Sequence, residues 1–330
     1  MPVRKPFSKD IILLENVGQV VDNIVEQLRE DVLLRFKRHG AVVGISGGID
    51  SSVCLALAAK AFGPDKVLGI MLPEKDSSPD SEMLARELAS RFGVRAIKEE
   101  ITGALAGFGC YERRDEAVKR VFPEYDPKTW KMKIGIRQSG LFNNIPPIFY
   151  LTVIDPSGNA KDKILPANEY LQIVAASNFK QRTRMSMLYY HAEALHYCVV
   201  GTPNKHEQEQ GFFVKYGDGA GDVMPIGNLY KTQVYQLAEF LGVPKGIIGR
   251  TPTTDTYSAE QTQEEFFYQL PFHLMDRFWY GFENGYPAAE VAAVMGETTE
   301  RVEALFRNFE RKRKTTEYLR MPPIRDYYHG

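Results

Sequence analysis

The stretch that decides the fold is AVVGISGGIDSSVCLALAAKAF, residues 41–62. Its first six residues form an apolar run, which is typical of a buried strand. Gly47 and Gly48 interrupt this run, and the small, apolar residues 51–62 that follow are typical of a helix packed on a sheet. A strand, a glycine-rich turn and a helix in this order predict an α/β fold.

The same alternation extends to both sides of this stretch. Apolar residues recur at helical spacing over residues 16–38, which predicts an amphipathic helix. Buried strands are expected over 66–71 and 94–101, with a helix over 79–92 between them. Strand, helix, strand, helix and strand together predict a doubly wound parallel sheet.

The alternation stops over residues 103–166, which we interpret as a β-rich insertion. Charged and aromatic residues, glycine and proline occur here without helical periodicity. Residues 147–154 resemble a strand, 155–158 a tight turn and 161–165 a returning strand. A substrate lid and a surface or dimer-contact excursion both fit this composition.

The rest of the chain predicts further helices and one more strand. The expected order is a helix over 169–176, a helix over 181–195, a strand over 196–201, a loop or hairpin over 212–226, a helix over 231–241 ended by Gly242, and a loop over 249–262. We expect the chain to be mostly helical from residue 264 to residue 319. We expect one domain over 1–330, with 264–330 as a helical C-terminal region.

Composition excludes several classes of protein. The net charge of the 330 residues is −1, whereas nucleic-acid binders usually carry a basic excess. Cys54, Cys110 and Cys198 are too far apart for a disulfide framework, which favours a reducing compartment. No apolar segment has the length of a signal peptide or a membrane span. We therefore expect a cytoplasmic protein that binds neither nucleic acid nor membrane.

The turn after the first strand has the chemistry of a phosphate cradle. A helix start offers unpaired N–H groups and a positive dipole end, and the glycines allow an anion to approach closely. Ser46 and Ser51 add hydroxyl donors. Asp50 would repel phosphate by itself, so its presence indicates a bound cation that bridges to the phosphates. The Walker motif is excluded because no lysine follows the glycines.

These residues carry a resemblance to a known family. The pattern SGGIDS, 46–51, resembles the pyrophosphate loop of ATP pyrophosphatases. SNFKQRTRM (177–185), GFFVKYGDG (211–219), Gly201-Thr202 with Glu207, and Pro252-Thr253 are similar in order and spacing to segments of ammonia-dependent NAD synthetases. That resemblance covers residues 44–255. It implies an adenine-nucleotide α-hydrolase-like, Rossmann-like fold.

The resemblance also implies roles for individual residues. Asp50 and Lys231 would be catalytic, and Mg²⁺ would be held by Asp50 and Glu207. Deamido-NAD would contact Arg182, Lys215 and Asp222, with Asp218 as a further candidate for the same pocket. ATP would contact Gly44, Ile45, Ser46, Gly47, Gly48, Ile49, Asp50, Ser51, Thr202, Lys231 and Thr253.

The implied activity is that of a ligase that forms a carbon–nitrogen bond. ATP would adenylate the nicotinate carboxylate of deamido-NAD, and ammonia would then displace AMP to give NAD, with pyrophosphate released in the first step. Glutamine-dependent members carry an amidase domain ahead of the loop, whereas only about forty residues precede Ser46 here. Free ammonia is therefore the expected nitrogen source, and the resemblance further implies a homodimer.

Two departures from the family and three alternatives stay open at this point. Pro203-Asn204-Lys205-His206 replaces the usual Asp-His-Ala-Ala, and the C-terminal His-Lys-Arg segment could correspond to residues 312–313 or 319–320. A tRNA-thiolating enzyme would need reactive cysteines or a basic face. An AMP sensor would have lost the chemistry, which Asp50 and Glu207 argue against. Residues 287–313 resemble a helix-turn-helix, although a helical subdomain with a solvated basic face fits better.

Overall fold

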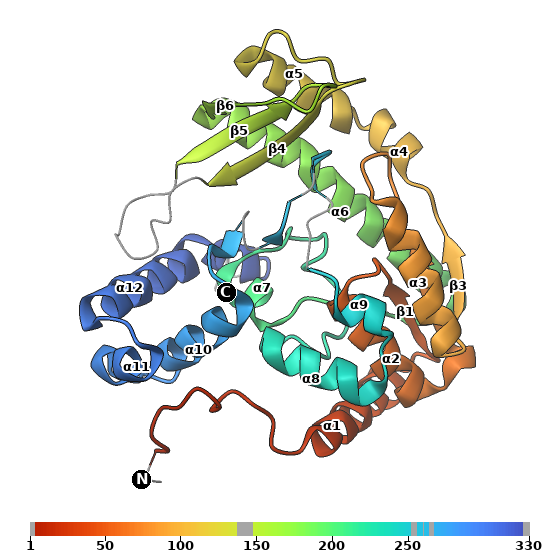
Figure 1. The fold of residues 1–330 in the computed structure, drawn as a ribbon. Helices are drawn as coiled ribbons and strands as arrows, with labels where there is room; N and C mark the ends of the chain where they lie inside the picture. The colour runs from red at the N-terminus through yellow and green to blue at the C-terminus, as the bar shows by residue number, and fades with distance from the viewer. Residues whose placement is uncertain (1–3, 137–147, 252–255, 260, 264–266, 326–330) are drawn as a thin grey trace, which may run out of the picture.

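A parallel sheet of four strands forms the centre of the molecule (Figure 1). The computed structural model describes residues 4–136, 148–251, 256–259, 261–263 and 267–325. The sheet has the order β3-β2-β1-β7, and every neighbouring pair is parallel. Its strands are β1 (Ala41–Gly44), β2 (Val67–Met71), β3 (Arg95–Lys98) and β7 (Cys198–Val200). The predicted α/β fold with a doubly wound parallel sheet is confirmed.

Helices cover both faces of this sheet. Val43 and Val200, its in-register neighbour on β7, pack with α1 (Val17–Arg29), α2 (Ile49–Phe62) and α8 (Lys231–Leu241). Val42, one residue earlier, points to the other face and packs with α6 (Ala167–Leu195). Successive residues of a strand point to opposite faces, so a strand covered on both sides must be apolar throughout.

Further helices connect the strands around the sheet. α3 (Pro79–Arg91) follows β2, and α7 (Lys205–Gln210) follows β7. The connections also include η1 (Glu30–Arg35), η2 (Pro64–Lys66) and α9 (Lys245–Ile248). Helix α8 ends at Gly242, which adopts a left-handed conformation with φ 76° and confirms the predicted C-cap.

The expectation of two helices over 169–195 is wrong, because α6 is one helix of 29 residues. The sequence Ser177-Asn178 has low intrinsic helix propensity and reads as a break. In the folded chain Ser177 and Lys180 lie in the middle of α6, and the surrounding structure buries both. Tertiary contacts of this segment outweigh the local propensity, as they often do in a long buried helix.

The expectation that residues 103–166 lack helices is also wrong. Their first part forms α4 (Thr102–Gly107) and α5 (Cys110–Val121), and α5 packs along α6. The second part contains β4 (Lys131–Ile136), β5 (Phe149–Ile154) and β6 (Ala160–Ile164) in one antiparallel sheet. The predicted strand, turn and returning strand are confirmed by β5, the turn and β6.

The C-terminal region is helical and has its own core. It consists of α10 (Phe272–Glu283), α11 (Ala288–Met295), α12 (Thr299–Thr315) and α13 (Glu317–Arg320). Phe7 from the start of the chain joins this core, and Figure 1 shows the N-terminal segment running beneath these helices. The apolar faces of α11 and α12 pack with α10, which supports the helical-subdomain interpretation of residues 287–313.

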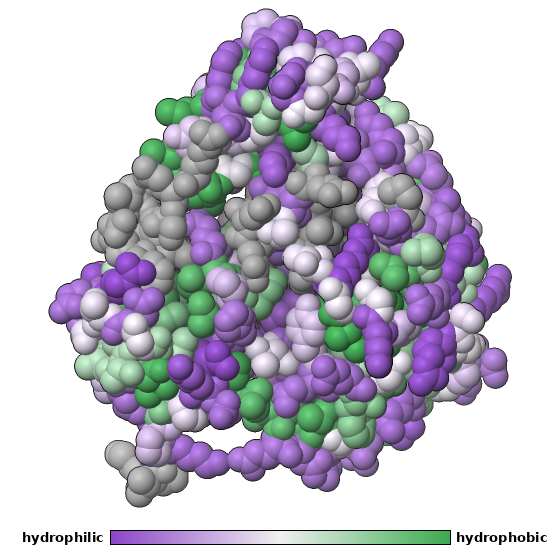
Figure 2. Space-filling model, in the orientation of Figure 1, coloured by the Kyte–Doolittle hydropathy of each residue, from purple (hydrophilic) through white to green (hydrophobic). Residues whose placement is uncertain are grey.

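The surface is predominantly polar. Figure 2 shows hydrophilic side chains over most of one face, with apolar residues in small, separate groups. Within the described part of the chain, no helix combines the length and the apolar character needed to cross a membrane.

Candidate active site

A cavity of about 770 Å³ opens at the carboxyl ends of the sheet strands. The segments that follow β1, β2 and β7 all contribute to its lining. The chain proceeds from β1 to β2 and β3 on one side and later returns to place β7 on the other side of β1. Ligands of open α/β sheets bind at such a reversal of strand order.

The glycine-rich turn forms the part of the cavity that follows β1. Helix α2 begins at Ile49, with Gly48 as its N-cap. Gly47 has φ +75°, and a Cβ there would lie 2.9 Å from the carbonyl oxygen of Ser81, so only glycine fits without strain. Ser46 lines the cavity and is exposed, and its Oγ accepts from the Gly48 amide at 3.3 Å.

The Ser51 hydroxyl holds the turn closed. Its Oγ donates to the carbonyl oxygen of Gly48 at 3.0 Å and lies 3.3 Å from the Ser46 amide nitrogen, which donates to it. Ser52 also donates to the Gly48 carbonyl, at 2.8 Å. The turn is thus fixed by its own hydroxyl groups, with the start of α2 directed at the cavity.

A cluster of charged groups lies beside this turn. The ammonium of Lys231, the first residue of α8, is buried and is hydrogen-bonded to Asp50. Asn204 Nδ2 donates to the other oxygen of Asp50 at 3.3 Å, and the Asn204 backbone amide donates to Glu207 at 2.9 Å. Asp50, Glu207 and Lys231 therefore come from three elements that are far apart in the sequence and meet at one wall of the cavity.

Asn204 occupies one of the positions that depart from the family pattern. It is fully buried and forms the N-cap of α7, in a capping box with Glu207. Because the same side chain also reaches Asp50, it fixes both carboxylates. The asparagine that departs from the family pattern therefore orients Asp50 and Glu207 in this structure.

The charges of this cluster are unbalanced. Burial and the negative charge of Asp50 raise the pKa of Glu207 to about 8, although Lys231 opposes the shift. Burial alone would lower the pKa of Lys231, but Asp50 and Glu207 outweigh it and raise that pKa. Two carboxylates that repel each other are oxygen donors of the kind that Mg²⁺ prefers, so these residues fit the ion. Among the described residues no three His, Cys, Asp or Glu side chains form a complete metal-binding group.

Asp218 lines the same cavity from the loop after α7. Its carboxylate accepts from the Val214 amide at 2.7 Å. Burial raises the pKa of Asp218 to about 6, against the lowering effect of the Val214 hydrogen bond and of Arg184. Arg184 also lines the cavity, from α6.

Most of the residues predicted to contact ATP line the cavity. Thr202 and Lys231 line the cavity, together with all of residues 44–51 except Gly47. Gly47 supports the turn from behind through its backbone conformation. The prediction for Thr253 lies outside the described residues.

Arg182, Lys215 and Asp222, which were predicted to contact deamido-NAD, do not line the cavity. Arg182 is exposed and donates to the Lys215 carbonyl at 3.3 Å, and Lys215 Nζ donates to two backbone carbonyls of residues 318 and 321 at 2.8 Å each. Asp222 accepts from the Val199 amide at 2.8 Å and from the Tyr189 hydroxyl at 3.2 Å. Their roles toward the dinucleotide stay predictions.

The C-terminal segment reaches the cavity. The sequence left open which of two positions in this segment corresponds to the His-Lys-Arg segment of the family. Leu319 lines the cavity, whereas Lys312 is directed to the carbonyl of Phe267 at 3.3 Å. Arg320 donates to the carbonyls at the end of α7, at 3.1 and 3.2 Å. Of the two candidate positions, residues 319–320 are therefore the ones that adjoin the site.

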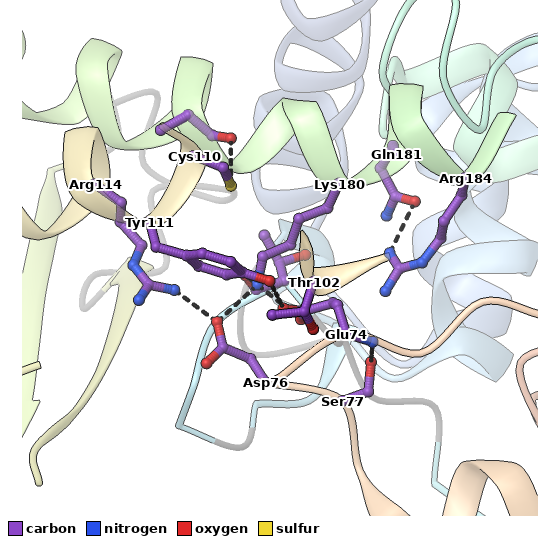
Figure 3. A network of polar contacts seen from close by, with 12 residues as sticks. Glu74, Asp76, Ser77, Thr102, Cys110, Tyr111, Arg114, Lys180, Gln181 and Arg184 are labelled. Carbon is purple, nitrogen blue, oxygen red and sulfur yellow. Dashed lines mark hydrogen bonds and ion pairs between the residues drawn. The ribbon is translucent and has the colours of Figure 1, made fainter. Parts of the chain in front are cut away.

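A second charged network lies at the cavity and was not predicted from the sequence (Figure 3). Lys180, from the middle of α6, is buried and donates to Glu74 at 2.9 Å, to Asp76 at 2.8 Å and to the Thr256 carbonyl at 3.0 Å. Glu74 and Lys180 both line the cavity. Glu74 follows β2, and a polar residue after a buried strand was the one signal that could have drawn attention to it.

This network extends into α5. Arg114 donates to Asp76 at 2.6 Å, and the Tyr111 hydroxyl donates to Glu74 at 2.8 Å. Burial would raise the pKa of Asp76, but Lys180 and Arg114 outweigh it and hold that pKa below its usual value. These partners are 37 to 106 positions apart in the sequence, so no local pattern could have paired them.

Fold and site together define an α/β protein whose cavity lies at the carboxyl ends of a parallel sheet. The family model for NAD synthase matches residues 20–122 and 150–316, and the chain belongs to this family. The gap in the match covers residues 123–149, which lie within the predicted insertion.

Curated relatives agree with this assignment. An "NH(3)-dependent NAD(+) synthetase" of Mesorhizobium japonicum is 50% identical over 304 residues, which cover 92% of this chain and 95% of the relative. A protein of the same name from Rhizobium rhizogenes is 44% identical, with 98% of this chain and 97% of the relative covered.

Solved structures show the same fold. The NH3-dependent NAD synthetase of Campylobacter jejuni superimposes with a TM-score of 0.61 at 19% identity, covering 95% of this chain and 100% of that one. The NMN synthetase of Francisella tularensis also gives a TM-score of 0.61, at 21% identity, covering 95% and 99%. These likenesses confirm the Rossmann-like arrangement.

Proposed function

We propose that the protein catalyses ATP-dependent amidation of deamido-NAD by ammonia, which yields NAD, AMP and pyrophosphate through an adenylated intermediate. One observation carries the proposal. The glycine-rich turn, Asp50, Glu207 and Lys231 meet in a single cavity at the reversal of strand order. The names of the relatives that match nearly the whole chain support this choice of reaction.

In this mechanism the turn binds the ATP phosphates. Backbone N–H groups at the start of α2 and the Ser46 hydroxyl would donate to phosphate oxygens, in a place where the helix dipole favours negative charge. Lys231 would stabilise the charge that develops on the leaving pyrophosphate. Its position is already fixed by Asp50, so little reorganisation is needed when that charge develops.

Asp50 and Glu207 would hold Mg²⁺. The ion would neutralise phosphate charge when bound. Its positive charge would also offset the burial of Glu207 and the repulsion from Asp50, which together raise the pKa of Glu207. Asn204 would orient both ligands through its side chain and backbone.

The acceptor side of the site is proposed from the family pattern. Arg182, Lys215 and Asp222 would contact deamido-NAD, and Thr253 would contact ATP. Arg182 and Lys215 lie beside each other outside the cavity, which supports a dinucleotide site completed by a second copy. We therefore propose a homodimer.

The wider setting follows from the same proposal. Free ammonia would be the nitrogen donor, and the enzyme would act in the cytoplasm. The chain would form one domain, with 103–166 as an insertion and 264–330 as the helical C-terminal region. The interruption of the family match at 123–149 supports the insertion.

Product analysis tests the proposal directly. Purified protein is incubated with ATP, Mg²⁺ and deamido-NAD, with either ammonia or glutamine as nitrogen donor. We expect NAD and AMP in equal amounts with ammonia, and no NAD with glutamine. AMP without NAD would point to another acceptor, and no nucleotide turnover would favour the AMP-sensor alternative.

A further inference from the structure

Helix α10 of the C-terminal region reaches the two elements that carry Glu207 and Lys231. Asp276, near its middle, is completely buried. One carboxylate oxygen lies 2.5 Å from Nε2 of His206, and the other accepts from the Thr232 amide at 2.7 Å. His206 is the residue before Glu207, and Thr232 is the residue after Lys231. A single carboxylate therefore joins the neighbours of both site residues.

A second carboxylate on the same helix repeats this arrangement. Glu283 lies seven residues after Asp276, which places both on one face of α10. It accepts from the Tyr230 hydroxyl at 2.6 Å and pairs with Lys205 at 3.2 Å. Lys205 is the first residue of α7, and Tyr230 is the N-cap of α8. Helix α10 thus contacts the first turns of α7 and α8 at two points.

The surroundings make the Asp276 contacts strong and rigid. The His206 ring is buried and lies 5.7 to 6.0 Å from three aromatic rings, those of Tyr230, Tyr268 and Trp279. Hydrogen bonds to a charged group are stronger where water is excluded. Thr232 also belongs to the first turn of α8, where a carboxylate satisfies an otherwise unpaired N–H group and complements the helix dipole.

We propose that Asp276 is a positioning residue that fixes Glu207 relative to Lys231, with Glu283 as a second, weaker point of attachment. This inference rests on the proposed function, because it assigns Asp276 to the metal and phosphate side of that site. It gives the C-terminal helical region a catalytic purpose beyond its own stability. Asp276 itself does not line the cavity, so it acts only through the residues that it holds.

The test compares Asp276→Asn with Glu290→Gln. Glu290 belongs to the same helical region and also accepts a backbone N–H, that of Phe7 at 2.8 Å, so its hydrogen bond leads to the N-terminal segment and not to α7 or α8. In Asp276→Asn we expect kcat to fall about 10- to 100-fold and the Mg²⁺ concentration for half-maximal rate to rise about 10-fold. KM for deamido-NAD and every property of Glu290→Gln should stay near the wild-type values.

A binding measurement separates this inference from the proposed function. Calorimetric titration with ATP, with and without Mg²⁺, should show that Mg²⁺ strengthens ATP binding to the wild type much more than to Asp276→Asn. The comparison holds even if the wild type forms no NAD, which would refute the proposed function alone. A lower melting temperature with unchanged kcat and unchanged Mg²⁺ response would overturn the inference.

Substitutions of His206 keep the inference testable if Asp276→Asn does not fold. Glutamine can still donate a hydrogen bond to Asp276, whereas leucine fills the space without donating one. We expect His206→Gln to retain most of the wild-type Mg²⁺ response and His206→Leu to lose it about as far as Asp276→Asn would. Equal responses in the two variants would mean that the His206 contact has no positioning role.

Discussion

Two buried lysines line the cavity, and their surroundings differ in a way that separates chemistry from structure. Lys231 shares its place with Asp50 and Glu207, and the pKa of Glu207 is raised to about 8. Lys180 lies between Glu74 and Asp76, and the pKa of Asp76 is lowered because Lys180 and Arg114 both bind it. In the first cluster one lysine faces two carboxylates, so the charge of Glu207 is not fully compensated. In the second cluster the carboxylate of Asp76 is paired with two cations.

This difference indicates what each cluster does. A network whose buried charges are paired holds elements together, and the Lys180 network joins the segment after β2 to α5 and α6 (Figure 3). A cluster with excess negative charge is unfavourable until a cation binds, and such perturbed carboxylates are concentrated at functional sites. We therefore expect the same residue types to serve structure at one wall of the cavity and chemistry at the other.

The largest effect is expected from Asp50→Asn. The variant keeps the shape of the side chain but removes a negative charge that would hold Mg²⁺ and that binds Lys231. We expect AMP formation to fall by about a thousandfold or more, as when a group acting in transition-state charge stabilisation is lost. The circular dichroism spectrum should match the wild type. Full activity would refute the metal assignment.

A large loss of stability, with no direct effect on the chemical step, is expected from Lys180→Met. Removing this ammonium leaves Glu74 and Asp76 buried with fewer partners, and breaking a buried ion pair costs about 3–5 kcal/mol. Urea denaturation measures the change. Lys161→Met is the matched control, because its pair with Glu124 is on the surface, where an ion pair contributes little to stability. Equal losses in the two variants would contradict the structural role of Lys180.

The raised pKa of Glu207 predicts pH-dependent binding of Mg²⁺. A metal ligand must be deprotonated, so protons compete with the ion below pH 8. At saturating ATP we expect the Mg²⁺ concentration for half-maximal rate to fall by up to about tenfold between pH 7 and pH 8, and to level off above it. Glu207→Gln should lack this slope. A flat wild-type profile would show that Glu207 does not bind the ion.

The sequence was sufficient for those parts of the site that depend on local order along the chain. The turn at 46–51, its strand and its helix are contiguous, so their chemistry could be predicted together. The Lys180 network and the Asp276 contacts join residues that are 37 to 106 positions apart. They depend on how α6 and α10 pack, and α6 itself was predicted as two helices because its buried polar residues read as a break. Long-range pairing of charged groups leaves no periodic signal.

The smallest effect concerns stability, and it would separate the two clusters most clearly. Because the folded state raises the pKa of Glu207 from 4.5 to about 8, it binds more protons than the unfolded state between these values. Ionised Glu207 therefore destabilises the fold increasingly as the pH rises from 4.5 to 8.

Glu207→Gln has no charge to bury and can still accept from the Asn204 amide, as the capping box requires. Without Mg²⁺ we expect this variant to be as stable as the wild type near pH 4.5 and increasingly more stable as the pH rises to 8. Asp76→Asn should show the opposite sign, since the lowered pKa of Asp76 means that its ionised form stabilises the fold at neutral pH. Denaturation curves of both variants at several pH values decide the matter, and a loss of stability in Glu207→Gln at pH 8 would show that the Lys231 cluster is as well paired as the Lys180 network.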